Sequence, residues 1–284
     1  MIDLRALCRT RFSYAIICGP KELSRAQTLP MGLSVAIVAM NEEANLGRTL
    51  ASVRWADEIV VVDSGSTDRT CDIAREFGAK IIREPWRGYV AQKNYALELC
   101  TQDWILALDA DEEVSPGLAD EIRGVVSGGD KVEGYSMPRQ NLFLGRWMRH
   151  GGFYPDPKLR LFRRGAGYST GFDPHDRYEL KSRGPVKRFR HPLVHYTYPT
   201  LTLYLEHMNR YSSLGAKMAV GKGHRTFSVL NIVVRPLATF IYNYVCRLGF
   251  LDGREGLLLH LYHAGYVSWK YAKAWELARA KPPS

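Results

Sequence analysis

This 284-residue chain has few cysteines and no cysteine motif. The five cysteines stand far apart and form no C-x-x-C pair. This spacing argues against a zinc site and against a disulfide framework, and it fits a reducing compartment. The sequence also lacks the G-x-G-x-x-G pattern typical of dinucleotide-dependent oxidoreductases. It contains no internal repeat and no low-complexity tract.

Long uninterrupted apolar runs are also missing. The most apolar stretch, Phe227–Phe250, is interrupted by Arg235-Pro236 and by Arg247. A helix needs about 20 consecutive apolar residues to cross a bilayer, so we predict no transmembrane helix. Aromatic residues mix with lysines in the last 25 residues, which favours a helix at a membrane surface.

Positive charge is concentrated in the second half of the chain. Residues 1–130 carry 14 Lys and Arg against 20 Asp and Glu, whereas residues 131–284 carry 25 against 9. The formal net charge of +10 therefore divides into −6 and +16. The basic half favours an anionic partner, which a membrane surface, a phosphorylated glycan or a nucleic acid would each provide. An ordinary solvated basic surface would have the same composition.

Apolar runs and amphipathic segments alternate along residues 33–126. The runs predict strands, and the segments with 3.6-residue spacing predict helices. This alternation is typical of an open, mainly parallel α/β sheet. The predicted strands are Leu33–Met40, Glu58–Val62, Lys80–Arg83 and Trp104–Leu108, and the helices are Glu42–Val53, Asp68–Phe77, Tyr89–Cys100 and Ser115–Val126.

The pattern changes after residue 134 and divides the chain into three parts. Strands are predicted at Tyr135–Arg139 and Leu159–Arg163, with a loop rich in glycine and aromatic residues between them. The predicted helices that follow are Leu201–Lys217, Phe227–Leu248 and Arg254–Ala280. We expect Met31 to be the natural start, so that residues 1–30 are an extension, 31–198 an α/β domain and 199–284 a helical region.

The triplet Asp109-Ala110-Asp111 is the most informative motif. It follows the apolar strand WILAL, where two carboxylates can turn toward one divalent cation and a diphosphate. Mg²⁺ and Mn²⁺ prefer such oxygen ligands and keep positions open for phosphate. The alternative is an acidic loop that caps the helix beginning near Ser115.

Two further polar loops follow predicted strands. Asp63 begins the segment DSGSTD, and Asn41-Glu42 follows the first strand. Ligands of parallel α/β sheets bind outside the carboxyl ends of the strands, so these side chains are candidates for contact with a nucleotide. Each segment is also consistent with an ordinary loop between a strand and a helix, in which one residue caps the helix.

The order and spacing of these motifs resemble glycosyltransferase family 2. The resemblance rests on strand-Asn-Glu, VVDSGSTD, QKNYAL and LDADEEV within residues 33–126. Further on, KLRLFRR, His175-Asp176-Arg177, the segment 191–196 and FLDGREG are similar to a bacterial subgroup. That subgroup contains the lipopolysaccharide core β-glucosyltransferases that act on inner-core heptose.

The resemblance implies an inverting enzyme of GT-A fold, with a mainly parallel sheet flanked by helices and a C-terminal helical appendage. It implies a nucleotide-sugar donor, with UDP-glucose expected, a divalent cation (Mg²⁺ or Mn²⁺), and a glycan or glycolipid acceptor. Asp111 would bind the metal. The implied donor-binding residues are Asn41, Glu42, Asp63, Lys93 and Asp109.

The resemblance places the general base at Asp176. The subgroup usually has His-Glu where this chain has His175-Asp176, so the carboxylate is one methylene shorter. Chemistry requires a carboxylate on the acceptor side to take the proton of the attacking hydroxyl. Asp173, Glu179 and the more distant Asp156 are the alternatives, and a polar surface turn without catalytic function is another.

Other basic and imidazole groups remain open. A histidine of the cluster His191, His195 and Tyr196 would complete a metal site, bind phosphate or simply pack near the core. Among Arg160, Arg163 and Arg164, a guanidinium suits an acceptor phosphate. A solvated strand face is the simpler interpretation for Arg164.

Competing functions fit less well. A sugar-1-phosphate nucleotidyltransferase would need a basic, glycine-rich loop after the first strand, where this chain is acidic. A nucleic-acid-binding or other non-enzymatic basic protein would leave the acidic strand ends unexplained. We therefore expect no nucleic-acid partner, and a cytoplasmic enzyme attached to the inner face of the membrane through its basic half.

Overall fold

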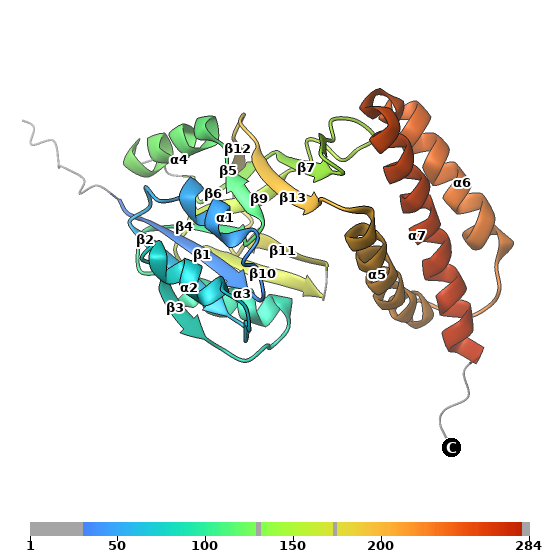
Figure 1. The fold of residues 1–284 in the computed structure, drawn as a ribbon, viewed down its shortest axis with the longest axis horizontal. Coiled ribbons are helices and arrows are strands. Elements are labelled where there is room, and N and C mark those ends of the chain that lie inside the picture. The colour runs from blue at the N-terminus through green and yellow to red at the C-terminus, as the bar shows by residue number, and fades with distance from the viewer. Residues whose placement is uncertain (1–30, 129–131, 173–174, 280–284) are drawn as a thin grey trace, which may run out of the picture.

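The computed structural model describes residues 31–128, 132–172 and 175–279 (Figure 1). The predicted extension, residues 1–30, lies outside the described residues, as do Asp173 and Ala280. The described chain forms an α/β part built on one large sheet and a separate group of helices at its C-terminal end.

The large sheet has seven strands in the order β12-β6-β9-β4-β1-β2-β3. Strands β1 to β4 are parallel neighbours, and β9 is antiparallel to both β4 and β6. The sheet is therefore mainly parallel, as predicted. Its strands are β1 (Leu33–Ala39), β2 (Glu58–Asp63), β3 (Lys80–Arg83), β4 (Trp104–Asp109), β6 (Gly134–Met137), β9 (Lys158–Arg163) and β12 (Val186–Arg188).

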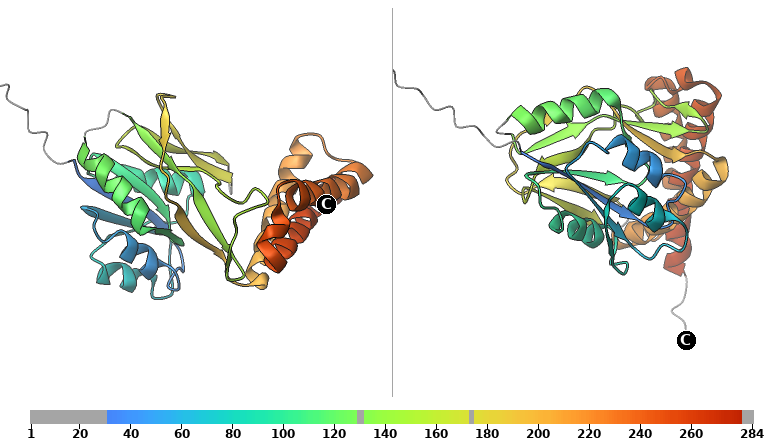
Figure 2. Two further views of the ribbon diagram at one scale, coloured as in Figure 1. Left: turned by 90° about the horizontal axis from the view of Figure 1, so that it is seen from above. Right: turned by 60° about the vertical axis from the view of Figure 1, so that its left-hand side comes forward.

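Two smaller sheets extend the α/β part. One has the order β5-β13-β7-β8, and its strands are β5 (Glu112–Val114), β13 (Leu193–Tyr198), β7 (Arg139–Phe143) and β8 (Arg146–Trp147). The other is an antiparallel pair of β10 (Gly167–Phe172) and β11 (His175–Leu180). Figure 2 shows that the strands of the β7 sheet lead from the large sheet toward the C-terminal helices.

Helices cover both faces of the large sheet because its strands are apolar on both sides. One core cluster includes Leu50, Leu106 and Ile122, and the other includes Val62, Ala96 and Ile105. Burial on both faces explains why strands such as LSVAIVA are continuous apolar runs rather than alternating ones. The helices are α1 (Leu46–Ser52), α2 (Thr70–Glu76), α3 (Tyr89–Glu98) and α4 (Pro116–Gly128).

The C-terminal region is helical, as expected. Helices α5 (Leu201–Gly221) and α7 (Gly253–Arg279) pack along each other. The predicted single helix over 227–248 is present as an unbroken helical stretch over residues 229–246, built of short α-helical and π-helical elements and followed by a 3₁₀ turn. These elements are the π-helical η1 (Leu230–Val234), α6 (Arg235–Phe240), the π-helical η2 (Ile241–Cys246) and the 3₁₀-helical η3 (Gly249–Asp252).

A separate apolar cluster joins the helices to the strands. Phe143 of β7, Met148, Tyr204 of α5 and Leu259 of α7 are all buried in it. Burying a large apolar side chain contributes roughly 1.5–3 kcal/mol. This cluster therefore holds the helical region against β7 and β13, beside the ends of the strands that carry the site.

Candidate active site

The predicted site lies where β1, β2 and β4 end. Asp63 is level with Ala39 in the pairing of β2 with β1, and Asp109 is level with Val38 in the pairing of β4 with β1. Because the three strands are parallel, their carboxyl ends share one edge of the sheet. The fold thus brings the loops after all three strands together, as the sequence predicts.

Lys93 connects this edge to the β10–β11 pair. Its Nζ atom lies 2.8 Å from Asp109 Oδ1 and 2.8 Å from Asp176 Oδ2. The Lys93 side chain is only 10% exposed, and its ammonium lies 5.7 Å from the centre of the Tyr178 ring. Burial would lower the pKa of Lys93, but the negative charge of Asp109 outweighs it and raises that pKa. Lys93 is therefore a fixed cation between two carboxylates.

Asp176 reaches Lys93 because it lies on a strand. It belongs to β11, which pairs with β10, and not to the polar surface turn that was the alternative. The side chain of Asn94, on α3, holds β10 in place although most residues of that strand are small. Its amide accepts from Ser169 N at 2.7 Å and donates to Ser169 O at 2.9 Å.

Two alternative bases have other partners. Glu179 lies three residues after Asp176, on the opposite face of β11, since side chains alternate along a strand. It accepts from Arg177 Nε at 2.7 Å and from the Tyr168 hydroxyl at 3.1 Å. Asp156 is paired with Arg139 and Lys158 at 2.8 and 2.9 Å.

A buried ionic network lies beneath Asp109. Arg160 forms ion pairs with Asp109 and with Glu112. The Glu112 carboxylate is fully buried, and its Oε1 atom lies 2.6 Å from Arg160 Nη2. Burial would raise the pKa of Asp109, but Arg160 and then Lys93 hold it well below its ordinary value. Arg160 is thus turned into the protein, and the expectation that it meets an acceptor phosphate is not supported by its position.

Asp111 faces a histidine of the predicted cluster. His195 Nε2 of β13 lies 3.1 Å from Asp111 Oδ2. His195 Nδ1 lies 2.8 Å from Asn141 Oδ1, and the Asn141 amide nitrogen donates to Phe153 O at 3.0 Å. The Thr197 hydroxyl also lies 2.8 Å from His195 Nδ1, and a hydroxyl both donates and accepts, so these contacts are compatible with either tautomer of the ring. The Asp111 carboxylate and the His195 imidazole are thus close enough to bind one cation together.

The donor set fits a divalent cation that shares its coordination with substrate. Among the described residues, no group of three or more His, Cys, Asp or Glu side chains is placed to hold a metal alone. One carboxylate and one imidazole suffice where phosphates and water complete the shell. Nearby negative charge adds to the fit. Burial, followed by repulsion from Asp111, Asp68 and Asp109, raises the pKa of Glu42.

The loops after β1 and β2 support each other. Asn41 adopts a left-handed backbone conformation (φ 56°), which Asn tolerates better than most residues. Its side-chain oxygen accepts from Thr67 N at 2.9 Å. Asp63 is fully buried and accepts from Ser66 N at 3.1 Å, so its carboxylate shapes the turn of its own loop.

Sequence reasoning named Glu112 only as the last member of the acidic cluster that begins at Asp109, and it did not single out Arg139, Asn141 or Tyr178. Glu112 was visible as part of the acidic run after Asp111, and its position one residue beyond the triplet was the available signal. The other three come from strands of the second half, and their partners are distant in sequence. His191, by contrast, lies away from Asp111 and is 3.3 Å from Glu121.

Residues 34–203 match the family described as Glycosyl transferase family 2. The chain belongs to this family and is a glycosyltransferase. It is 32% identical over 228 residues to the lipopolysaccharide core biosynthesis glycosyltransferase LpsC of Rhizobium meliloti (strain 1021), covering 78% of this chain and 82% of that one. It is 31% identical over 257 residues to an uncharacterized glycosyltransferase of Rickettsia typhi (strain ATCC VR-144 / Wilmington), covering 87% of each.

A solved structure shares the fold. The mannosyltransferase PcManGT from Pyrobaculum calidifontis, in complex with GDP-Man and Mn²⁺, has a TM-score of 0.52 and 15% identity, covering 88% of both chains. The predicted GT-A fold with a C-terminal helical region is therefore confirmed. Membership of this enzyme family removes the nucleotidyltransferase and the non-enzymatic alternatives.

Proposed function

We propose that this chain is an inverting glycosyltransferase that moves glucose from UDP-glucose to a glycolipid of the lipopolysaccharide core. The observation that carries the proposal is the position of Asp176, which the β10–β11 pair brings to the edge that holds Asp109 and Lys93. The similarity to LpsC supports an acceptor of this class.

The donor is assigned to the loops at the strand ends. Asn41, Glu42 and the turn held by Asp63 would surround the nucleoside, and Asp109 and Lys93 would lie beside the sugar and the diphosphate. Lys93 is suited to this role because the adjacent carboxylates of Asp109 and Asp176 keep it charged despite its burial. A cation in place before the donor arrives needs no reorganisation when the diphosphate binds.

Asp111 and His195 would hold the divalent cation. When bound, the cation would neutralise charge on the departing diphosphate. Asn141 contributes by fixing the ring of His195 through Nδ1, and such supporting hydrogen bonds orient metal ligands. PcManGT was solved with Mn²⁺ and a nucleotide sugar, which agrees with this chemistry.

Asp176 would act as the general base. The acceptor hydroxyl attacks the anomeric carbon from the face opposite UDP, the new C–O bond forms, and the bond from that carbon to the diphosphate oxygen breaks. The hydroxyl proton passes to Asp176 and later to solvent. Lys93 orients the carboxylate, whose side chain is only 11% exposed.

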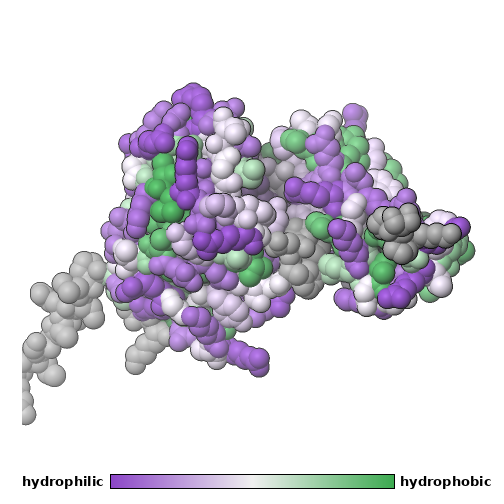
Figure 3. All heavy atoms as spheres, turned by 90° about the horizontal axis from the view of Figure 1, so that it is seen from below, coloured by the Kyte–Doolittle hydropathy of each residue, from purple (hydrophilic) through white to green (hydrophobic). Residues whose placement is uncertain are grey.

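A membrane-facing surface agrees with a lipid-linked acceptor. Residues 227–251 carry large apolar side chains that are each at least 45% exposed, and many recur at helical spacing. Patches of this extent mark sites of interaction. In Figure 3 the helical region, on the right, shows green apolar areas beside purple hydrophilic ones. The residues are Phe227, Val229, Leu230, Val233, Val234, Leu237, Ile241, Tyr242, Val245, Leu248, Phe250 and Leu251.

We assign this apolar face to an anionic bilayer surface. Exposed cations flank it, among them Lys222, Arg225, Arg247 and Arg254. Each such charge near an anionic membrane contributes about 1 kcal/mol. No helix in the described part of the chain is long and apolar enough to span a bilayer. Attachment at the inner face would bring the enzyme to a lipid-linked acceptor where nucleotide sugars are made.

Release of UDP tests the proposed function. Purified protein is incubated with UDP-glucose and Mn²⁺, with and without heptose-containing core lipopolysaccharide. We expect UDP release that depends on the metal and rises with the acceptor. A panel of other nucleotide sugars identifies the donor, and faster release from another sugar would correct the donor while leaving the mechanism in place. No release with any donor would contradict the proposal.

A further inference from the structure

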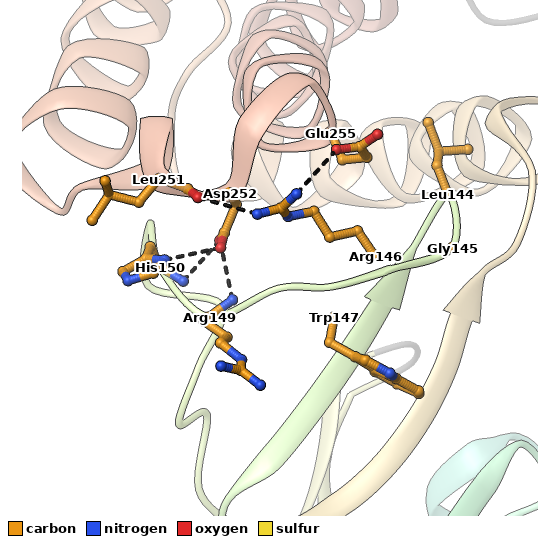
Figure 4. A pocket seen from close by; sticks show the side chains of 9 residues that line it. All are labelled: Leu144, Gly145, Arg146, Trp147, Arg149, His150, Leu251, Asp252 and Glu255. Atoms are coloured by element: carbon orange, nitrogen blue, oxygen red, sulfur yellow. Dashed lines mark hydrogen bonds and ion pairs between the residues drawn. The ribbon is translucent and has the colours of Figure 1, made fainter.

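An open cavity of about 610 Å³ lies between the β7–β8 turn and the start of α7. Figure 4 shows its lining, which includes Arg146, Trp147, Arg149, Leu251 and Glu255. None of these residues belongs to the proposed donor and metal site, although Leu251 is also part of the exposed apolar face. The function of the cavity must therefore be inferred separately from that of the proposed active site.

A buried carboxylate builds the wall of this cavity. Asp252 is 1% exposed and accepts from the backbone N–H groups of Arg149 and His150 at 3.0 and 2.8 Å. Its other oxygen lies 2.9 Å from His150 Nδ1. Asp252 thus ties the backbone of the loop after β8 to the helical region. Its hydrogen bond with Arg149 comes from the backbone N–H and does not depend on the Arg149 side chain.

The cations of the cavity are only partly compensated. Arg146 donates to Leu251 O at 3.2 Å, but its Nη1 atom is 3.8 Å from Glu255, which is beyond a good hydrogen bond. The exposed side chain of Arg149 makes no hydrogen bond or ion pair that we find within the described ranges. In Figure 4, Arg146 points toward Glu255, whereas Arg149 and Trp147 point to the other side of the loop.

The cavity adjoins the proposed metal site through aromatic contact. The Trp147 ring meets the Tyr196 ring edge-on, with 5.4 Å between their centres. Tyr196 follows His195 and donates its backbone N–H to Asp111 O at 3.1 Å. On the other side, Leu251 lines the cavity and is also the last residue of the exposed apolar face. The cavity thus lies between the metal site and the membrane-facing surface.

We infer that this cavity binds an anionic group, a phosphate or carboxylate, on the glycan acceptor. Arg149 would contact the anion, since a guanidinium group matches the geometry of a phosphate or a carboxylate, whereas Arg146 points to the other side of the loop and stays with Leu251 and Glu255. The Trp147 ring would contact an adjoining sugar ring. The inference rests on the proposed function, because it places the acceptor between the bilayer and the reacting hydroxyl.

Binding measurements test the inference without requiring turnover. A heptose oligosaccharide with a phosphate monoester and the same oligosaccharide without it are titrated calorimetrically into wild-type protein, Arg149→Gln and Arg164→Gln. Arg164 is the matched control, an exposed arginine directly after β9, whose backbone N–H donates to Asp103 O.

We expect Arg149→Gln to weaken binding of the phosphorylated sugar roughly tenfold, as for loss of one charge-assisted hydrogen bond, and to leave the other sugar unaffected. Arg164→Gln should bind both as wild type does. Equal binding of the phosphorylated sugar by wild type and Arg149→Gln would overturn the inference, and so would equal weakening for both sugars.

Two further measurements distinguish this inference from a lipid-headgroup site and from the proposed function. Phosphatidylglycerol vesicles replace the sugar, and a loss of vesicle affinity in Arg149→Gln without a loss for the sugar would assign the cavity to a lipid headgroup and overturn the inference. UDP release is measured in parallel. Selective sugar binding without UDP release would support the cavity's role and refute the proposed function. UDP release without selective sugar binding would support the proposed function and refute the cavity's role.

Discussion

The ammonium of Lys93 lies 2.8 Å from a carboxylate oxygen of Asp176, although 83 residues separate them in sequence. The same ammonium is 2.8 Å from Asp109. The donor side and the acceptor side of the proposed reaction are thus joined through one buried cation. This geometry makes Asp176 the carboxylate whose replacement is most informative.

Asp176→Asn should lower kcat by about 10²- to 10⁴-fold, the usual loss on removal of a general base. The affinity for UDP-glucose should hardly change, because Asp109 and Asp111 remain. Asp176→Glu should keep far more activity. Steady-state kinetics and donor binding measure the two effects separately.

Glu179→Gln is the matched control on the same strand, since Glu179 bonds Arg177 and Tyr168 instead. It should transfer at nearly the wild-type rate. A dead Glu179→Gln or Asp173→Asn together with a fully active Asp176→Asn would move the base by a few residues. Full activity of all three would place the base in another part of the chain.

The metal assignment predicts different effects at Asp111 and His195. Asp111→Ala should nearly abolish transfer while the fold stays intact, because it removes the only carboxylate ligand proposed. His195→Gln should raise the Mn²⁺ concentration for half-maximal activity about 10- to 100-fold, as losses around metal sites commonly do. Metal titrations of activity measure this, with His191→Gln as the control. Unchanged metal dependence in both variants would refute the site.

The membrane assignment predicts binding that depends on both charge and apolar contact. Wild-type protein should sediment with vesicles that contain phosphatidylglycerol, and added salt should release part of it because salt screens the basic flank. Leu230→Glu/Leu237→Glu should bind much less while still releasing UDP from UDP-glucose. A solution dimer that the double variant abolishes, without vesicle binding by wild type, would identify the face as a contact between two copies.

Stability should fall as the pH drops from about 6.5 to about 4. The His260 ring is 1% exposed, and burial, with a smaller effect of His263, lowers its pKa to about 4. Burial likewise lowers the pKa of His207 to about 4. Between these values and 6.5 the unfolded chain binds more protons than the folded one, so folding stability is lost on acidification.

Thermal unfolding at pH 7 and pH 5 checks this prediction. His260→Gln should show a smaller loss of melting temperature than wild type, and the loss that remains is due to His207 and His263, whose pKa values burial also lowers. His224→Gln is the control, because His224 is exposed, and it should behave as wild type does. Equal losses in His260→Gln and wild type would show that this ring does not govern the acid sensitivity.

The first half of the fold was predictable because its signals are local. Apolar runs gave β1 to β4 within a residue or two, and parallel pairing then aligned the ends that carry Asp63 and Asp109. The neighbourhood of Asp176 was not predictable in this way. β10 is rich in Gly, Ser and Thr, and it is a strand because of its pairing with β11 and the bonds from Asn94.

Partners that lie far apart in sequence also escaped prediction. Arg160 was expected at an acceptor phosphate, but its buried side chain neutralises Asp109 and Glu112. Such a network depends on which residues of β9 lie beside β4, because a shift of the pairing by one residue turns every side chain of the strand to the other face of the sheet. Lys93 and Asp176, both named from the resemblance to a family, lie in contact in the structure, while their roles and that of Asp111 stay predictions.

The stereochemistry of the product tests the central claim most directly. UDP-glucose carries its glucose in the α configuration, so an inverting transfer assisted by Asp176 must form a β-glycoside. The protein is incubated with UDP-glucose, Mn²⁺ and a heptose oligosaccharide, and the anomeric proton of the new linkage is read by NMR. The account predicts a β-linked product with the large H1–H2 coupling of that anomer, and an α-linked product would contradict it.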